Sequence, residues 1–482
     1  MSIVLARLRN PLTSIIFVYL VMGTLYALFT PLWQAPDEPA HYNYIKYLAE
    51  NRRLPVLRMG DYPHEYLEEI KAAKFPSEMS ITPIRYEFHQ PPLYYFLATP
   101  IYLLFDGELL PLRILSVILG SALLYVAYSI VREIFPDKGL ALGTAAFVAF
   151  VPMHVAITAA VNNDALAELI LASVLWMLVR YIRGDKKRLI WLGLLMGLGL
   201  LTKITAYIAI PLALSAVAIA CWPLRCWDVK MLRCLLLPFS CSLLLAFPWF
   251  VRNALVYGDL DLLGLKRHDA IVVGQPRTSE WLARYGASGV ARRLLLTTFR
   301  SFWAQFGWMG VLVDERIYLA LALLCALVGL GFLLFVAKVL RRRRLTAFQA
   351  RALGLLALSA LFTLLSYLWY NVKFIQHQGR YLFPALVPIG LAFSLGLQEI
   401  LDRGKLAASL LSAMALLLTI QGLLKGDLSY NLVLVGGAAL AFWIEAFWPK
   451  RHRLLFFALP FFGLCALDAI CLFKFIIPAL AP

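Results

Sequence analysis

Long apolar segments, separated by short charged stretches, recur along most of this chain. Most of them are about 18 to 24 residues long, which is enough to cross a hydrocarbon core about 30 Å thick as an α-helix. Backbone polar groups in lipid must be hydrogen-bonded within each segment, so the pattern predicts an all-α integral membrane protein with residues 1–482 in a single polytopic domain. Segment length and flanking charge predict about thirteen spans, at residues 11–32, 110–131, 139–160, 165–183, 188–202, 204–222, 231–252, 316–338, 350–371, 381–401, 405–424, 431–447 and 453–476.

Two polar segments are much longer than the others, residues 33–109 and 253–315. The apolar run from Pro91 to Phe105 lies within the first of these two segments. Counting this run as a span would invert the topology of every later span, so we expect a helix that lies in the outer membrane interface. Long loops beside a helical bundle often carry function. The helices predicted within residues 381–482 complete the membrane domain.

The basic residues account for the formal net charge of +17 without a nucleic-acid partner. They lie mostly in short runs between apolar segments, as the positive-inside rule describes. With the N-terminus in the cytoplasm, these runs all face the cytoplasm and both long loops face outside. The runs are Arg132/Lys138, Arg180 to Arg188, Arg225 to Arg233, Arg341 to Arg344, Arg403/Lys405 and Lys450 to Arg453. The seven cysteines lie in or beside apolar segments, a placement that predicts neither a disulfide framework nor a zinc site.

The first candidate for chemistry is the carboxylate pair directly after the first span, Asp37 and Glu38. Asp37 fits the N-cap of a following helix, with Glu38 and Pro39 as favoured first-turn residues. A carboxylate held at a helix start beside the membrane surface could also act as a general base. One of its oxygens can cap while the other faces a cleft, so both interpretations stay open.

A second group of candidates follows in the same loop, at His89, Gln90, Tyr94 and Tyr95. The two prolines between Gln90 and Leu93 fix the entry into the interfacial helix, and tyrosines suit a membrane boundary. This motif therefore fits an interface anchor, while His89 could also donate to a phosphate.

The remaining candidates are charged residues that map to the same side of the predicted bundle. Asp164 follows two asparagines and fits either a helix cap or a second acid. Lys203 interrupts an apolar stretch, and a lysine at such a depth is costly enough to suggest a functional site. Arg252 and Arg380 lie at span ends, where they could snorkel to headgroups or bind a lipid phosphate.

In their order and spacing these motifs resemble a known family, the polytopic C-type (GT-C) glycosyltransferases that use lipid-phosphate sugars. That superfamily includes the protein O-mannosyltransferases and the lipid A aminoarabinose transferase, and this chain is most similar to its bacterial, phospholipid-carrier-dependent branch. The resemblance implies a GT-C-like bundle, multi-pass in a bacterial inner (plasma) membrane, with the active site on the periplasmic or extracellular face. It covers most of residues 11–385, through Pro36-Asp37-Glu38-Pro39-Ala40-His41, His89-Gln90-Pro91-Pro92-Leu93-Tyr94-Tyr95, Asn163-Asp164, Gly199-Leu200-Leu201-Thr202-Lys203, Pro248-Trp249 to Asn253 and Gly379-Arg380-Tyr381.

The resemblance also implies roles for individual residues. The family's catalytic acid corresponds to Asp37, with Glu38 beside it, and its second acid corresponds to Asp164. The aminoarabinose transferase carries a lysine where this chain has Gln90, so that phosphate contact must come from elsewhere. The residues expected to bind substrate are His41, His89, Tyr94, Lys203, Arg252, Arg380 and Tyr381.

Together, these inferences predict an inverting glycosyltransferase in which Asp37 takes the acceptor's proton and polyprenyl phosphate leaves. The expected partners are a polyprenyl-phosphate sugar donor, membrane lipid and a glycan, lipid or protein acceptor. No cofactor is required, although Asp37, Glu38 and Asp164 could hold a divalent metal. Two other functions stay open, a flippase or transporter of lipid-linked sugars and a noncatalytic subunit of a glycan-assembly complex.

Overall fold

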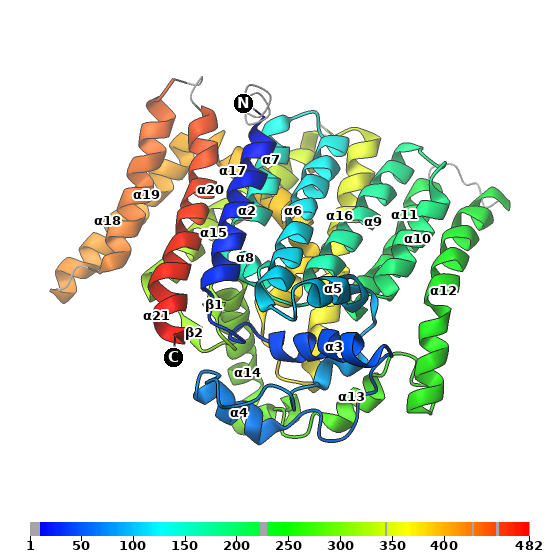
Figure 1. Ribbon diagram of the computed structural model, residues 1–482. Helices are drawn as coiled ribbons and strands as arrows, with labels where there is room; N and C mark the ends of the chain where they lie inside the picture. The colour runs from blue at the N-terminus through cyan, green and yellow to red at the C-terminus, as the bar shows by residue number, and fades with distance from the viewer. Residues whose placement is uncertain (1–9, 222–228, 343–344, 427–428, 450–452, 482) are drawn as a thin grey trace, which may run out of the picture.

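The computed structural model describes residues 10–221, 229–342, 345–426, 429–449 and 453–481 as an almost entirely helical chain (Figure 1). Eleven of the described helices are long and apolar enough to cross a membrane, and a bent pair makes up to twelve. The all-α membrane prediction is therefore confirmed, and the count of about thirteen is not. Parts of three predicted basic loops, at 222–228, 343–344 and 450–452, lie outside the described residues.

The helices that could span follow the predicted segments closely. They are α2 Pro11–Phe29, α6 Leu109–Ile134, α9 Asp164–Arg183, η2 Ile204–Ile208 with α11 Ala209–Cys221, α12 Val229–Tyr257, α15 Glu315–Arg342, α16 Ala347–Lys373, η4 Gly379–Ala385 with α17 Leu386–Leu401, α18 Gly404–Lys425, α19 Tyr430–Phe447, and α20 Arg453–Ile470 with η6 Cys471–Ile476 and α21 Ile477–Leu480.

Two predicted spans differ from the structure. The predicted span 139–160 is broken into α7 Lys138–Ala149 and α8 Pro152–Thr158, which meet at 64°. The break follows from Pro152, because a proline disfavours the helical conformation of the residue before it, here the extended Val151. The predicted span 188–202 is α10 Leu189–Leu200, whose 12 residues end before an extended Lys203.

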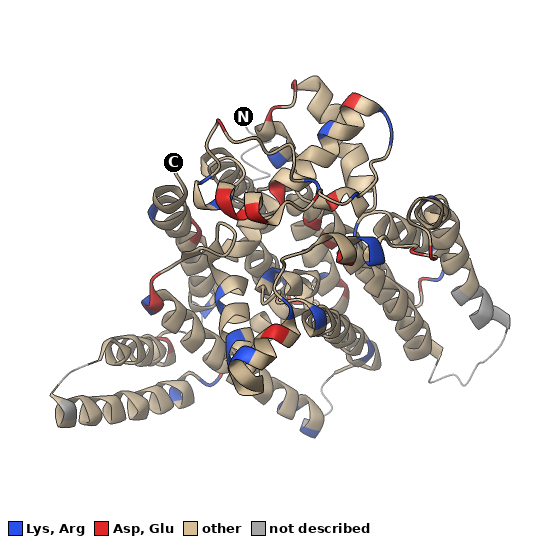
Figure 2. Cartoon of the chain, turned by 90° about the horizontal axis from the view of Figure 1, so that it is seen from below, with Lys and Arg blue, Asp and Glu red and all other residues tan. Residues whose placement is uncertain are grey.

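The two long polar segments meet at one end of the bundle, the lower end in Figure 1. Viewed from that end, acidic and basic residues are interspersed on the helices and loops that cover it (Figure 2). The 12-residue α5 corresponds to the predicted interfacial helix, whose place in a membrane stays a prediction. The elements that these two long segments form are α3 Glu38–Asn51, α4 His64–Ala72, η1 Tyr86–His89, α5 Leu93–Leu104, α13 Leu265–Ile271, α14 Thr278–Trp303 and the antiparallel strands β1 Gln305–Phe306 and β2 Val311–Leu312.

Helices α15 and α17 cross at their closest through two glycines. A Cβ atom added to Gly331 would lie 2.0 Å from the carbonyl oxygen of Gly396. One added to Gly396 would lie 2.2 Å from the carbonyl oxygen of Val328. Small residues allow such close backbone approach between membrane helices, where packing rather than hydrophobic burial holds the helices together.

We expect Gly331→Val to destabilise the protein by about 1–3 kcal/mol or more, because the added atoms meet a backbone that cannot move aside. Gly329→Val on the same helix is the control, since nothing lies within 4 Å of a Cβ atom there. Thermal unfolding in detergent measures both. If the two variants unfold at the same temperature, α15 and α17 can move apart at this crossing without loss of stability.

Candidate active site

A cavity of about 300 Å³ opens at the end of the bundle where the two long segments meet. It lies among the start of α3, η1, α13, the end of α16 and the start of η4. The titratable residues that line this cavity come from segments far apart in the sequence. They are Asp37, His41, Glu87, His89, Lys203, His268, Asp269, Tyr367, Tyr370, Lys373, Arg380 and Tyr381.

Asp37 lies at the mouth of α3 with its backbone in the left-handed region, at φ 67°. Its side chain makes no capping bond, so the side-chain N-cap interpretation is wrong. Both oxygens are engaged elsewhere: the Tyr86 hydroxyl donates to Oδ1 at 2.7 Å, and Arg380 Nη2 donates to Oδ2 at 2.6 Å. Burial alone would raise the pKa of Asp37, but the ion pair with Arg380 outweighs it and lowers the pKa to about 2.

A second ion pair links Lys203 to Asp164. Lys203 lines the cavity, and its Nζ donates to Asp164 Oδ1 at 2.6 Å. Asp164 is the first residue of α9, and its own backbone N–H is capped by Asn162 Oδ1 at 2.9 Å. The N-cap residue of α9 is Asn163, so the carboxylate of Asp164 does not cap this helix. It compensates the charge of Lys203.

Two histidines line the same cavity in their neutral form. Burial lowers the pKa of His41 to about 3, and it lowers the pKa of His89 well below its usual value. His89 Nδ1 lies 3.0 Å from the carbonyl oxygen of Tyr86, which can only accept, so Nδ1 carries the proton. Nε2 of the neutral ring is then an acceptor, which argues against His89 as a donor to phosphate at neutral pH.

Four predicted site residues do not line the cavity: Asp164 reaches it only through Lys203, and the other three lie elsewhere. Glu38 is fully buried against Arg113, which donates to its two oxygens at 2.8 and 2.6 Å. Tyr94 is buried in the main core with its hydroxyl 3.1 Å from Ser116 Oγ. Arg252 packs over the rings of Trp249 and Tyr257 instead of lining the cavity.

Sequence reasoning missed six titratable residues that line the cavity. They are Glu87, His268, Asp269, Tyr367, Tyr370 and Lys373. Glu87 lines the cavity with its Oε2 buried and without a hydrogen-bond partner among the described residues. Burial raises the pKa of Glu87 to about 7, helped by the nearby negative charge of Asp37. The signal was present, since Glu87 lies only two residues before His89, but nothing in the pattern indicates the 3₁₀ turn that points it inward.

The residues that the structure describes offer no group of three or more His, Cys, Asp or Glu side chains placed to hold a metal ion. The cavity presents instead three cations, Arg380, Lys203 and Lys373, each paired with a carboxylate. Such a site can take up an anionic group by exchanging one of these partners.

One family model and several solved structures match this chain. The family model described as dolichyl-phosphate-mannose-protein mannosyltransferase matches residues 89–250, less than half of the chain. That range includes Asp164 and Lys203 but neither Asp37 nor Arg380. A search of curated proteins found no match.

Solved structures show a likeness over nearly the whole chain. ArnT from Cupriavidus metallidurans bound to undecaprenyl phosphate aligns with a TM-score of 0.54 and 16% identity, over 95% of this chain and 76% of that one. The Archaeoglobus fulgidus oligosaccharyltransferase in the apo form aligns with a TM-score of 0.50 and 16% identity, over 95% of this chain and 56% of that one. The archaeal oligosaccharyltransferase AglB from Archaeoglobus fulgidus, with an inhibitory peptide and a dolichol-phosphate, aligns with a TM-score of 0.50. These matches confirm the C-type glycosyltransferase resemblance at the level of the fold.

We expect Glu38→Ala to lower stability by about 3–5 kcal/mol, because it leaves the buried Arg113 guanidinium without its countercharge. Glu50→Ala on the same helix should change it by about 1 kcal/mol or less, since its pair with Lys46 is exposed. Thermal unfolding in detergent distinguishes the two. A Glu38 variant as stable as the Glu50 variant would contradict a structural role for Glu38.

A pH effect should follow from Glu87. The folded protein holds the proton up to pH about 7, while the ordinary pKa is 4.5, so this group makes stability fall as pH rises between these values. His41, which is neutral in the folded protein, makes stability rise with pH and so opposes this effect. The test therefore compares two proteins: the stability of wild type minus that of Glu87→Gln should fall between pH 4.5 and 7. The exposed Glu65→Gln serves as control, and parallel curves for wild type and Glu87→Gln would refute the assignment.

Proposed function

We propose that this chain, which has the membrane fold of the C-type glycosyltransferases, moves a sugar from a polyprenyl-phosphate carrier to an acceptor. The observation that carries the proposal is the pairing of Arg380 with Asp37 inside a cavity that also holds Lys203. An arginine offers two parallel donors to a phosphate, and a carboxylate beside it is placed to take a proton. Undecaprenyl phosphate bound to ArnT and dolichol-phosphate bound to AglB support a polyprenyl-phosphate carrier.

The donor phosphate binds by competing with Asp37 for Arg380. As the guanidinium turns to the phosphate, Asp37 loses the partner that lowers its pKa, while burial, which raises it, persists. The carboxylate therefore becomes a stronger base once the donor is in place. Lys203 can likewise share its charge between Asp164 and the phosphate.

The transfer itself is one displacement. The acceptor's oxygen or nitrogen attacks the anomeric carbon as its proton passes to Asp37, and the bond from that carbon to the phosphate oxygen breaks. Polyprenyl phosphate leaves with the electron pair, and Arg380 stabilises the charge that develops on it. Attack from the side opposite to the leaving group inverts the anomeric centre. Glu87, with a pKa of about 7, lies in the same cavity and can relay the proton from Asp37 to solvent.

The finer assignments follow the charge pattern and the resemblance. The basic clusters favour a cytoplasmic N-terminus, so the cavity opens on the periplasmic or extracellular face of a bacterial inner membrane. The acceptor is a glycan, lipid or protein that reaches this face. A transporter of lipid-linked sugars would require bound sugar to cross the bundle without a change in its linkage, which the following experiment distinguishes.

The test compares wild type with Asp37→Asn. Mass spectrometry of surface glycans, lipids and proteins should reveal a sugar modification that is present with wild type. We expect Asp37→Asn to transfer this sugar at a rate at least about a hundredfold lower. Asparagine keeps the shape of the side chain but removes the countercharge of Arg380, so thermal unfolding in detergent must first establish that the variant is folded. A well-folded Asp37→Asn protein that supports the same modification at the normal rate would overturn the proposed base.

Arg380→Lys should weaken binding of undecaprenyl phosphate by at least about tenfold, since lysine offers a point charge in place of a planar fork. Arg252→Lys is the matched control, because Arg252 does not line the cavity and should bind as wild type does. Titration of the lipid phosphate in detergent measures both. Equal affinities for both variants and wild type would remove Arg380 from the donor site.

A further inference from the structure

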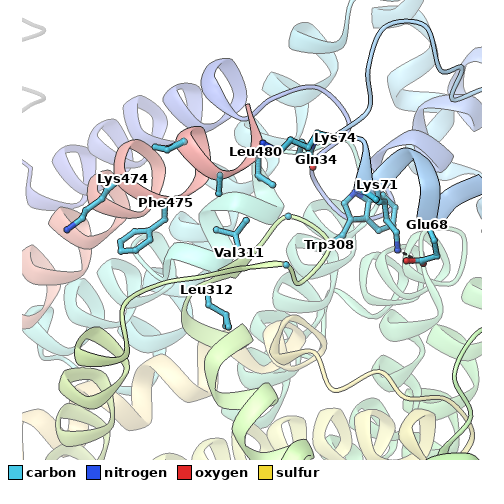
Figure 3. Close-up of a pocket in the computed structure, with 15 residues that line it drawn as sticks. Gln34, Glu68, Lys71, Lys74, Trp308, Val311, Leu312, Lys474, Phe475 and Leu480 are labelled. Atoms are coloured by element: carbon cyan, nitrogen blue, oxygen red, sulfur yellow. Dashed lines mark hydrogen bonds and ion pairs between the residues drawn. The ribbon is translucent and has the colours of Figure 1, made fainter. Parts of the chain in front are cut away.

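A second cavity, of about 740 Å³, lies at the same end of the bundle and plays no part in the proposed transfer. It is enclosed by the end of α4, the turn between β1 and β2, and the η6–α21 segment near the end of the described chain. Figure 3 shows Lys71, Lys74, Gln34 and Trp308 on one side of this pocket and Lys474 on the other. Its walls thus come from four regions of the sequence, with Gln34 belonging to the segment between α2 and α3.

The charge in this pocket is predominantly positive. Three lysines line it against a single carboxylate, Glu68, which is paired with Lys71 at 2.5 Å. Lys74 donates to the carbonyl oxygen of Ala481, and the ammonium of Lys474 lies 5.8 Å from the ring of Phe475. Within the described ranges, neither Lys74 nor Lys474 forms an ion pair, so this pocket favours an anion.

A buried amide in the wall also lacks a partner. Gln34 lines the pocket and is 3% exposed, yet its Nε2 finds no acceptor among the described residues. A buried N–H donor without a partner destabilises the folded protein, and a bound oxygen would remove that cost. The amide therefore supplies a donor to the same group that the lysines attract.

The backbone of both walls is strained. Lys74 and Trp308 adopt left-handed conformations, at φ 61° and 53°, although neither is a glycine. Such conformations are unfavourable for residues other than glycine and persist only where the surroundings hold them, often at ligand sites. Here the ring of Trp308 stacks on Phe75 with centroids 6.0 Å apart, which fixes the two walls to each other.

An apolar strip on the outside of the bundle leads away from this pocket. Phe29, Leu32 and Phe473 are about half exposed, at 47%, 59% and 50%. Leu32 lies two residues before Gln34, Phe473 directly precedes Lys474, and the rings of Phe29 and Phe473 lie 5.9 Å apart. A ligand with an anionic head and a hydrocarbon chain fits both parts at once.

We propose that this pocket binds the phosphate headgroup of an anionic membrane phospholipid, whose acyl chains lie along Phe29 and Phe473. The phosphate oxygens accept from Lys74, Lys474 and Gln34 Nε2. The proposal does not rest on the transferase function. It has one consequence for the active cavity, because Gln34 belongs to the segment that ends at Asp37, and a bound headgroup holds that segment in place.

The test is native mass spectrometry of the full chain in detergent, titrated with phosphatidylglycerol or with zwitterionic phosphatidylcholine. We expect the double variant Lys74→Gln/Lys474→Gln to lose at least about tenfold in affinity for phosphatidylglycerol while its affinity for phosphatidylcholine is unchanged. Lys138→Gln/Lys187→Gln, two exposed lysines at the opposite end of the bundle, is the charge-matched control. The control should bind as wild type does.

Two further arms keep the proposal falsifiable. If Lys74→Gln fails to fold, the exposed Lys474→Gln alone should still lose at least about threefold in affinity, and Lys474→Arg should not. Glycerol 1-phosphate reports on a soluble phosphate ligand and should bind at least about a hundredfold more weakly than the lipid. Unchanged phosphatidylglycerol binding by the lysine variants, or equally tight glycerol 1-phosphate, would overturn the assignment.

Discussion

The position of the candidate site depends on one buried ion pair, between Arg113 and Glu38. The guanidinium donates to both oxygens of Glu38 and to the carbonyl oxygens of Ala27, Thr30 and Pro31, which end α2. A membrane helix leaves its last carbonyls without partners, and a buried carboxylate needs a countercharge, so a single side chain meets both needs. This ties the end of α2 to the start of α3. Asp37, the residue before Glu38, is thereby turned outward into the cavity.

Around this anchor, each cation of the cavity is paired with a carboxylate. Arg380 is compensated by Asp37, Lys203 by Asp164 and Lys373 by Asp269, while His41 and His89 are neutral. Buried cations could not be desolvated at a membrane boundary without such partners. The same partners make the cations exchangeable, since an incoming phosphate offers oxygens of the same kind. Under the proposed function, the acids compensate these cations before the donor phosphate binds, and Asp37 becomes available as a base after it binds.

The sequence predicts the bundle well because the length and apolarity of a span are local properties, although the predicted span 139–160 missed the break at Pro152 between α7 and α8. It also identifies Asp37, Lys203 and Arg380 as unusual charges. It does not predict that Arg380 pairs with Asp37, 343 residues away, or that Arg252 faces aromatic rings instead of the cavity. Those outcomes depend on helix rotation, which packing decides. The inward turn of Glu87 depends on a short 3₁₀ element whose sequence carries no periodic signal.

The brevity of α10 has a consequence for how a lipid carrier would arrive. Its 12 residues rise about 18 Å, well short of a hydrocarbon core of about 30 Å, and Lys203 follows directly at its end. With the proposed topology, in which α10 starts at the cytoplasmic surface, the ammonium group lies below the headgroups of the opposite surface. A polyprenyl phosphate can reach it by sliding sideways within the bilayer, without its chain entering water. Encounter is then a two-dimensional search, governed by the mole fraction of the carrier in the membrane and not by its bulk concentration.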